Sequence, residues 1–225
     1  MCSRGRRLRR FFTAHAVSLL LLLYFAACGR GPYDSIRNFR STGEQIICFG
    51  DSLTEGVGAG EGEDYPAVLT EKLGIAVVNA GRRGDTTAEA LTRIPRDVLE
   101  KNPRLVIVLL GGNDFLRQVP VGETKKNLAE IVRQIQAGGA MVAIAGVRLG
   151  WFTDEYGPMF EEIAGQASAL YMPHVLKGIL SDAKLRSDAI HPNAAGYRVV
   201  AERIAKEIMP LLREANRRRG ANVSG

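Results

Sequence analysis

Cysteine is scarce in this chain, with three residues in 225, at Cys2, Cys28 and Cys48. Because Cys2 and Cys28 lie in the amino-terminal segment, the rest of the chain holds one cysteine and cannot form an internal disulfide. Cys48 stands between Ile47 and Phe49, in a run typical of a buried strand, where a thiol behaves as a small apolar side chain. A reactive cysteine needs electropositive, partly exposed surroundings. The sequence therefore argues against a cysteine nucleophile.

Signals for metals, nucleotides and nucleic acids are also missing. No His/Cys cluster has metal-ligand spacing, and Gly56–Gly60 lacks the Lys-Ser/Thr of a phosphate-binding loop, so we expect no cofactor. The formal charge of +6 belongs to the two ends: five arginines precede residue 28, the tail from Glu214 carries net +2, and the remainder is about −1. A nucleic-acid-binding protein keeps its basic residues on the folded domain. We expect no nucleic-acid partner.

The amino-terminal residues 1–27 have the pattern of a signal peptide. Arginines are followed by the apolar run Ala16–Ala27, which is shorter than the roughly 20 residues of a membrane span. Phe25–Cys28 resembles a bacterial lipobox, although Phe25 replaces the usual leucine, and Arg9–Phe12 faintly resembles a twin-arginine export signal. We expect an exported lipoprotein, anchored through Cys28 to a membrane on its periplasmic or extracytoplasmic side. An uncleaved anchor and ordinary cleavage near Ala27 are the alternatives.

Strand-like and helix-like runs alternate in the rest of the chain. We expect a flexible tether at 28–45, one domain at 46–213 and a disordered basic tail at 214–225. Alternating strands and helices predict βαβ units, and hence a flavodoxin-like three-layer α/β/α fold with a parallel sheet of about five strands. The predicted strands are Ile46–Phe49, Ile75–Val78, Leu105–Leu110, Met141–Ala145 and Leu170–Met172. The predicted helices are Tyr65–Leu73, Thr86–Lys101, Glu123–Ala137, Pro158–Ala169 and Asn193–Arg213.

Polar motifs follow several of these strands. In an open α/β sheet the loops at the carboxyl ends of the strands gather in one crevice, where ligands bind. Four motifs at such positions therefore predict one active site. They are Gly50-Asp51-Ser52-Leu53-Thr54-Glu55-Gly56, Asn79–Thr86, Gly111-Gly112-Asn113-Asp114 and Ser187-Asp188-Ala189-Ile190-His191-Pro192-Asn193.

Three of the motif residues have the chemistry of a catalytic triad. A serine hydroxyl needs a base within hydrogen-bond reach, and a third group must hold that base in the right tautomer. Ser52 as nucleophile, His191 as base and Asp188 as orienting carboxylate meet this need. Taken singly, a Gly-Asp-Ser turn is often only a helix cap and a His-Pro is often surface structure. Their joint order along the chain favours a serine hydrolase.

Together the four motifs resemble the GDSL, or SGNH, hydrolase family, in particular its bacterial thioesterase I/lysophospholipase L1/arylesterase branch. The resemblance covers about Ile46 to Leu212. It implies the same triad and an oxyanion hole made by the backbone N–H groups of Ser52 and Gly84 and the side-chain amide of Asn113. Such neutral donors would stabilise the negative oxygen of an acyl-transfer intermediate.

The groove around this site is less clearly defined by sequence. Relatives carry small or apolar residues where this chain has Arg82 and Arg83, so Arg83 is either a solvated charge or a cation at the rim that favours substrates bearing an anion. The loop from Leu149 to Gly157 corresponds to one that borders the acyl groove in the family. Its candidates for a hydrophobic wall are Leu149, Trp151, Phe152 and Tyr156; packing of this loop onto its own domain is the alternative.

The sequence thus predicts an exported esterase, thioesterase or lysophospholipase that acts on a small-molecule or lipid ester. A carbohydrate O-deacetylase is an alternative within the same chemistry, since the triad serves any acyl ester. A non-catalytic lipoprotein that holds an anion at a helix amino terminus is a third reading. That third reading leaves Asp188, His191 and Asn113 without a role.

Overall fold

The computed structural model describes residues 31–147 and 156–221. The chain divides into two compact units, Met1–Ser35 and Ile36–Gly225. The described part of the first unit is a short turn in which the backbone N–H of Gly31 donates to Asp34 Oδ2 at 2.7 Å. The expected signal peptide and Cys28 lie outside the described residues. Within the described ranges, none of the helices combines the length and the apolar character needed to cross a bilayer.

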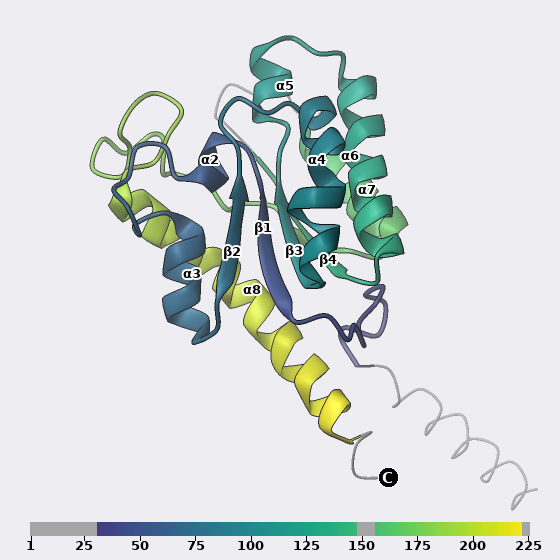
Figure 1. Ribbon diagram of the computed structural model, residues 1–225. Helices are drawn as coiled ribbons and strands as arrows, with labels where there is room; N and C mark the ends of the chain where they lie inside the picture. The colour runs from purple at the N-terminus through teal and green to yellow at the C-terminus, as the bar shows by residue number, and fades with distance from the viewer. Residues whose placement is uncertain (1–30, 148–155, 222–225) are drawn as a thin grey trace, which may run out of the picture. The chain divides into compact units, whose positions relative to one another are not determined.

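The second unit is built on a five-stranded parallel sheet with the order β2-β1-β3-β4-β5 (Figure 1). β3 and β4, which follow one another across its centre, are apolar and almost wholly buried, as expected for strands covered on both faces. This arrangement confirms the predicted fold class. The strands are β1 (Gln45–Gly50), β2 (Val77–Gly81), β3 (Pro103–Leu109), β4 (Met141–Ala145) and β5 (Leu170–Met172).

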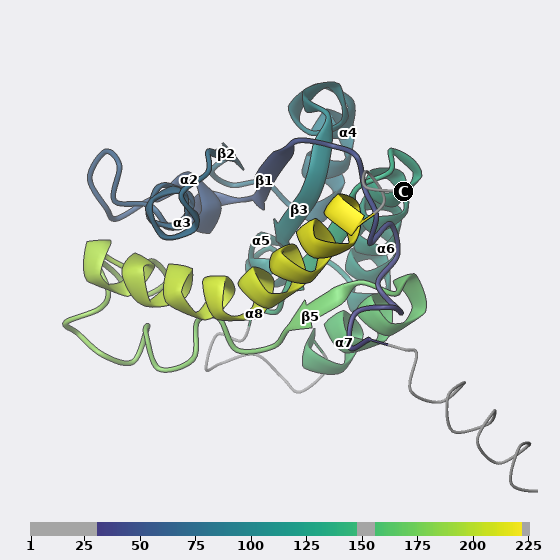
Figure 2. The same ribbon diagram turned by 90° about the horizontal axis from the view of Figure 1, so that it is seen from below.

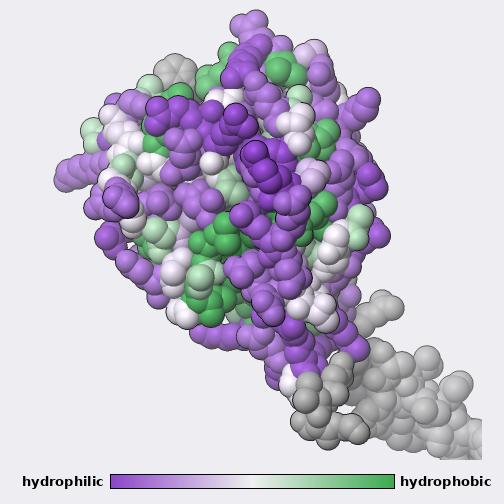
Figure 3. All heavy atoms as spheres, viewed as in Figure 1, coloured by the Kyte–Doolittle hydropathy of each residue, from purple (hydrophilic) through white to green (hydrophobic). Residues whose placement is uncertain are grey.

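Helices cover both faces of the sheet. α3 packs on α8 along one face, whereas α4, α6 and α7 pack side by side along the other (Figure 2). On the face of the molecule that Figure 3 shows, most side chains are hydrophilic and the apolar ones form separate groups. The helices are α2 (Ser52–Glu55), α3 (Tyr65–Leu73), α4 (Thr87–Asp97), the 3₁₀ turn η1 (Leu99–Lys101), α5 (Gly112–Leu116), α6 (Val121–Ala137), α7 (Tyr156–Ala167) and α8 (Ala194–Ala221).

The second strand begins later than its sequence predicts. Gly74 caps α3 in the left-handed conformation at φ 66°, and β2 starts only at Val77. Ile75 therefore lies before the strand with 47% of its surface exposed, although its apolar character places it in a predicted strand. β2 is an edge strand, so burial there is incomplete.

The prediction of a flexible tether is wrong from Ile36 onward, because this segment packs on the domain. Asn38 adopts a positive φ of 59°, and its side-chain amide donates to the carbonyl oxygens of Gln136 at 2.7 Å and Ala140 at 2.9 Å. Phe39, the next residue, is buried. The asparagine thus satisfies one carbonyl group in the last turn of α6 and another directly before β4, which a polar composition alone does not reveal.

The basic tail is also more ordered than expected, since α8 continues to Ala221. Glu214 accepts hydrogen bonds from Arg217 and Arg218, three and four residues later, which stabilises a helix. Ala215 is buried, and the Arg218 guanidinium lies 5.1 Å from the centre of the Phe39 ring. Cations also favour the carboxyl end of a helix through its dipole. The prediction of disorder is therefore wrong for residues 214–221.

Candidate active site

The first three motifs meet at the carboxyl edge of the sheet because of strand register. Gly50, the last residue of β1, pairs with Gly81 of β2 and with Leu109 of β3. The chain segments that follow these three residues therefore start at the same level. α2 and α5 begin there, directly beyond β1 and β3 (Figure 1).

Ser52 is the first residue of α2 and lies on a tight turn. A Cβ on Gly50 would come within 2.5 Å of the Leu109 carbonyl oxygen, so the strand can turn here only with glycine. Asp51 caps α2 by accepting the Leu53 N–H at 3.0 Å. Ser52 is largely buried, with 9% of its surface exposed.

The fourth motif completes a continuous chain of contacts from Ser52. His191 Nε2 lies 3.0 Å from Ser52 Oγ, and His191 Nδ1 lies 2.8 Å from Asp188 Oδ2. Asp188 Oδ1 accepts the backbone N–H groups of Ile190 and His191, both at 2.8 Å. Although partial burial opposes ionisation, these hydrogen bonds lower the pKa of Asp188 below its usual value. A carboxylate at this place favours the tautomer with a proton on Nδ1, which leaves Nε2 free to accept the Ser52 proton.

The loop that bears His191 is held against the segment after α2. Gly58 has a φ of 95°, and a Cβ there would lie 2.1 Å from Ser187 Oγ and 2.5 Å from the Pro192 carbonyl oxygen. The Tyr197 hydroxyl of α8 donates to the Val57 carbonyl oxygen at 2.8 Å. These close approaches fix the distance between the imidazole loop and the Ser52 turn.

The two remaining expected oxyanion residues come from neighbouring loops. Asn113 lies in α5, and its Nδ2 donates to the Asp85 carbonyl oxygen at 2.9 Å and lies 3.4 Å from Asp51 Oδ2. The longer of these contacts is near the limit of a hydrogen bond and is weak. Gly84 has a φ of 83°, which favours glycine, and its carbonyl oxygen accepts from Arg117 Nη2 at 2.6 Å.

Buried charges support these loops, and sequence reasoning missed them. Asp51, Asp85 and Asp114 are buried together with Arg93 of α4. Thr87 at the start of α4 donates to Asp114 from both its backbone and its side chain. A charged residue between buried positions of an amphipathic helix, as at Arg93, was the signal available in the sequence.

The expected groove residues fall into three groups. Leu149, Trp151 and Phe152 lie outside the described residues. Tyr156 is buried at the start of α7, where its ring meets Phe115 edge-on at 5.8 Å. Arg83 has an exposed side chain, but its backbone N–H donates to Glu55 Oε2 at 2.5 Å and its Nε lies 3.6 Å from Glu55 Oε1. Arg83 is thus paired with Glu55 at the protein surface.

A cavity of about 480 Å³ lies beside α5 and the start of α6. Its first lining residue, Phe115, stands two positions after Asn113 in the chain. Leu116, another lining residue, is unusually exposed for a leucine. The sequence pattern Phe115-Leu116 directly after the Asn113 motif was the signal that sequence reasoning missed. The cavity is lined by Phe115, Leu116, Gln118, Val119, Pro120, Val121 and Tyr156.

Metal and thiol chemistry have little basis in the part of the chain that the structure describes. Among residues 31–147 and 156–221, no group of three or more His, Cys, Asp or Glu side chains is arranged to hold a metal ion. Cys48 is fully buried in β1, and burial raises the pKa of its thiol well above the usual value. The expectation of an apolar role for this cysteine is confirmed.

Comparison with known proteins gives consistent results. Residues 48–199 match the GDSL-like Lipase/Acylhydrolase family. Esterase TesA of Pseudomonas aeruginosa is 30% identical over 187 residues, which cover 77% of this chain and 92% of that protein. Thioesterase 1/protease 1/lysophospholipase L1 of Escherichia coli K12 is 28% identical over 177 residues, covering 75% and 85%. A crystal structure of TesA superposes with a TM-score of 0.71 at 28% identity, over 75% of this chain and 99% of that one.

The buried carboxyl of Asp51 predicts a pH-dependent stability. Burial, with smaller effects of Asp114 and Asp85, raises the pKa of Asp51 from 3.8 to about 7. The folded state binds this proton more tightly than the unfolded state does. The stabilisation of the fold by protonated Asp51 is therefore complete below about pH 4 and is lost as the pH rises through about 7. Three pKa units correspond to at most about 4 kcal/mol of unfolding free energy.

Asp51→Asn should remove this dependence while keeping an oxygen to cap α2. Urea unfolding at several values between about pH 5 and about pH 8 measures it, with the exposed Asp182→Asn as control. As the pH rises, wild type and control should lose stability more steeply than Asp51→Asn does. Parallel profiles for all three proteins would show that Asp51 does not titrate in this range.

Proposed function

Because the chain belongs to the GDSL-like lipase/acylhydrolase family, we propose that its catalytic triad is Ser52, His191 and Asp188. The family and the named activities of the relatives make the chain a serine hydrolase that acts on esters, of the esterase, thioesterase and lysophospholipase type. The observation that carries the residue assignment is the unbroken series of contacts from Ser52 Oγ through the imidazole to the Asp188 carboxylate.

The reaction proceeds in two half-reactions on these groups. Ser52 Oγ attacks the acyl carbon while its proton passes to His191 Nε2, and the carbonyl oxygen becomes negative. His191 then gives that proton to the leaving alcohol or thiol as its bond to the acyl carbon breaks, which leaves an acyl-Ser52 ester. In the second half, His191 takes a proton from water as the water attacks this ester, and returns it to Ser52 Oγ as the carboxylic acid leaves. Asp188 keeps its charge throughout and stabilises the imidazolium.

The negative oxygen is stabilised by the N–H groups of Ser52 and Gly84 and by the side-chain amide of Asn113. Asn113 supports this assignment because one of its two amide contacts is firm and the other weak. The 2.9 Å bond to the Asp85 carbonyl oxygen orients the amide, whereas the 3.4 Å contact to Asp51 Oδ2 can be exchanged for the oxyanion. A donor fixed before the reaction begins costs no reorganisation in the transition state.

The apolar cavity beside α5 is the proposed acyl-chain site. Phe115 and Leu116 lie in the same short helix as Asn113, so a chain leaving the acyl carbon near Asn113 has this cavity next to it. The volume of about 480 Å³ falls within the range of small-molecule sites, roughly 300–1,000 Å³. Longer acyl groups than acetyl would use it, which favours an esterase or lysophospholipase over an O-deacetylase.

The enzyme is exported and held at a membrane by lipid on Cys28. Support for this part of the proposal comes from the arginine-rich start, the apolar run to Ala27 and the lipobox-like Phe25–Cys28. One acyl chain alone binds membranes only marginally, so a stable anchor needs the additional chains that lipoprotein maturation supplies.

Replacement of the triad residues tests the catalytic proposal. Ser52→Ala and His191→Ala should each lower kcat by about 10⁴–10⁶-fold, and the double variant should lose little more, because the triad acts as a unit. The exposed His174→Ala should keep wild-type turnover on the same ester. Independent losses that multiply in the double variant, or near-normal turnover of Ser52→Ala, would contradict the assignment.

A side chain that fills the cavity tests the acyl-chain site. Val119→Phe should lower kcat/KM for decanoyl esters relative to acetyl esters by at least about 10-fold, since losing room for a methylene costs about 1–3 kcal/mol. Ile75→Phe, at an exposed position before β2, is the control. Equal effects on all chain lengths would exclude the cavity as the acyl site, and a wild-type preference for acetyl esters would favour the O-deacetylase.

The anchor is tested with Cys28→Ser in cells given a clickable fatty-acid analogue. Wild type should carry the label and fractionate with membranes, whereas Cys28→Ser should be unlabelled and released, with unchanged turnover. Cys2→Ser is a matched control, because Cys2 would be removed with the signal peptide. A Cys28→Ser protein that stays in the membrane fraction would instead indicate an uncleaved amino-terminal anchor.

A further inference from the structure

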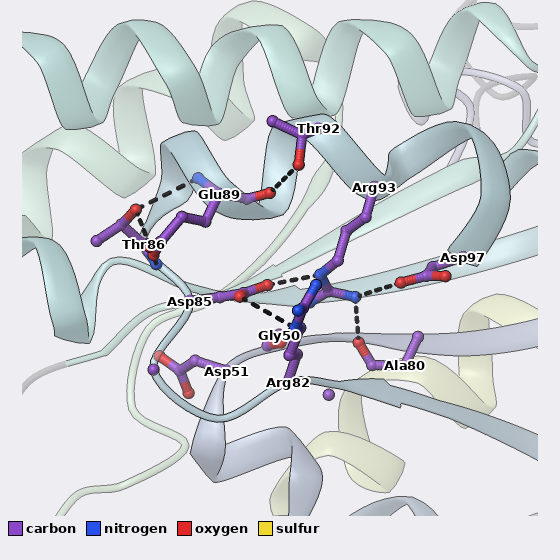
Figure 4. A network of polar contacts seen from close by, with 12 residues as sticks. Gly50, Asp51, Ala80, Arg82, Asp85, Thr86, Glu89, Thr92, Arg93 and Asp97 are labelled. Carbon is purple, nitrogen blue, oxygen red and sulfur yellow. Dashed lines mark hydrogen bonds and ion pairs between the residues drawn. The ribbon is translucent and has the colours of Figure 1, made fainter.

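One buried arginine joins several chain segments behind the proposed catalytic residues. Arg93 of α4 is 5% exposed, and its guanidinium group donates to acceptors from four places in the chain (Figure 4). Nε donates to Asp85 Oδ2 at 2.5 Å, and Nη2 to the Gly50 carbonyl oxygen at 2.8 Å. Nη1 donates to the Ala80 carbonyl oxygen at 2.9 Å and to Asp97 Oδ2 at 3.1 Å.

These contacts depend on the shape of the guanidinium group. Two of the acceptors, Gly50 O and Ala80 O, are carbonyl oxygens at the carboxyl ends of the neighbouring strands β1 and β2. The central carbon of the group lies over the Phe49 ring, 4.3 Å from its centre. Because a guanidinium is planar, its N–H donors all lie in one plane. A lysine ammonium carries the same charge but cannot reach several coplanar acceptors at once.

The segments that Arg93 holds are also those that hold the Asn113 amide. Asp85, whose carboxylate pairs with Arg93, supplies through its backbone the carbonyl oxygen that accepts from Asn113 Nδ2 at 2.9 Å. Asp51, whose Oδ2 lies 3.4 Å from the same nitrogen, directly follows Gly50. Each acceptor of the amide therefore belongs either to a residue that Arg93 contacts, Asp85, or to the residue that follows one, Asp51 after Gly50.

We propose that Arg93 is a positioning residue for ester hydrolysis, which fixes through Asp85 and Gly50 the two groups that orient the Asn113 amide toward the oxyanion. This inference rests on the role proposed above for Asn113. Arg93 touches neither substrate nor reacting atoms, and its effect is on the geometry of the transition state. Misplacement by about 1 Å is enough to lower a rate by roughly 10²-fold, so the expected loss falls on kcat rather than KM.

A double-mutant cycle between Arg93 and Asn113 separates this role from general stabilisation. Arg93→Lys should lower kcat about 10–100-fold with little change in KM. Asn113→Ala should lower kcat about 10²–10³-fold. In the Asn113→Ala background, Arg93→Lys should cost less than about 3-fold more, because residues that act through one another are not additive. Rates are counted per active site titrated with a fluorophosphonate, so that unfolded protein does not contribute.

Matched variants keep the result interpretable. Arg96→Gln removes a neighbouring exposed arginine that donates to Asp97, and it should keep the wild-type kcat. If Arg93→Lys does not fold, Asp85→Asn gives the same comparison, since it leaves Arg93 in place but weakens its link to the loop.

The possible outcomes are distinct. Wild-type kcat in Arg93→Lys, or equal losses in the wild-type and Asn113→Ala backgrounds, would overturn the positioning role and leave the proposed function intact. Full turnover of Asn113→Ala, or a wild type that the fluorophosphonate does not label at Ser52, would contradict the proposed function itself and the inference with it.

Discussion

Compensation of buried charge at the carboxyl edge of the sheet is the constraint on which the site depends. Asp85 is balanced by Arg93, whereas Asp114 accepts from Thr87, and the Asp51 carboxyl has a pKa raised to about 7. Arg93 and Thr87 both belong to α4, whereas Asp85 and Asp114 lie in the segments that follow β2 and β3, so these interactions tie the helix to both segments. The loops that present Ser52 thereby become rigid, which is the state that electrostatic stabilisation of a transition state requires.

Most of the fold follows from patterns that act over short distances in the sequence. The continuous apolar runs of β3 and β4 predict central parallel strands, and their alternation with amphipathic helices predicts the layers. The failures have physical causes. α2 and α5 are too short to show a helical period, and the packing of Ile36–Glu44 depends on carbonyl groups about 100 residues away.

The residues of the site likewise divide into those that the sequence predicted and those that it did not. Ser52, Asp188 and His191 could be named from sequence because each lies in a motif whose chemistry is local, and the structure places the three side chains in contact. Arg93 was missed, because a single charge on a helix is usually solvated and only the folded chain shows which acceptors it meets. The cavity beside α5 likewise exists only where α5, α6 and α7 meet.

A crystal structure of the protein inactivated by an alkyl phosphonate tests the central claim most directly, since the tetrahedral phosphorus imitates the acyl-transfer intermediate. The account predicts phosphorus bonded to Ser52 Oγ, with one phosphoryl oxygen about 2.7–3.1 Å from Asn113 Nδ2 and from the N–H groups of Ser52 and Gly84. It also predicts that Asn113 keeps its bond to the Asp85 carbonyl oxygen. An adduct on another residue, or a phosphoryl oxygen directed away from Asn113, would contradict it.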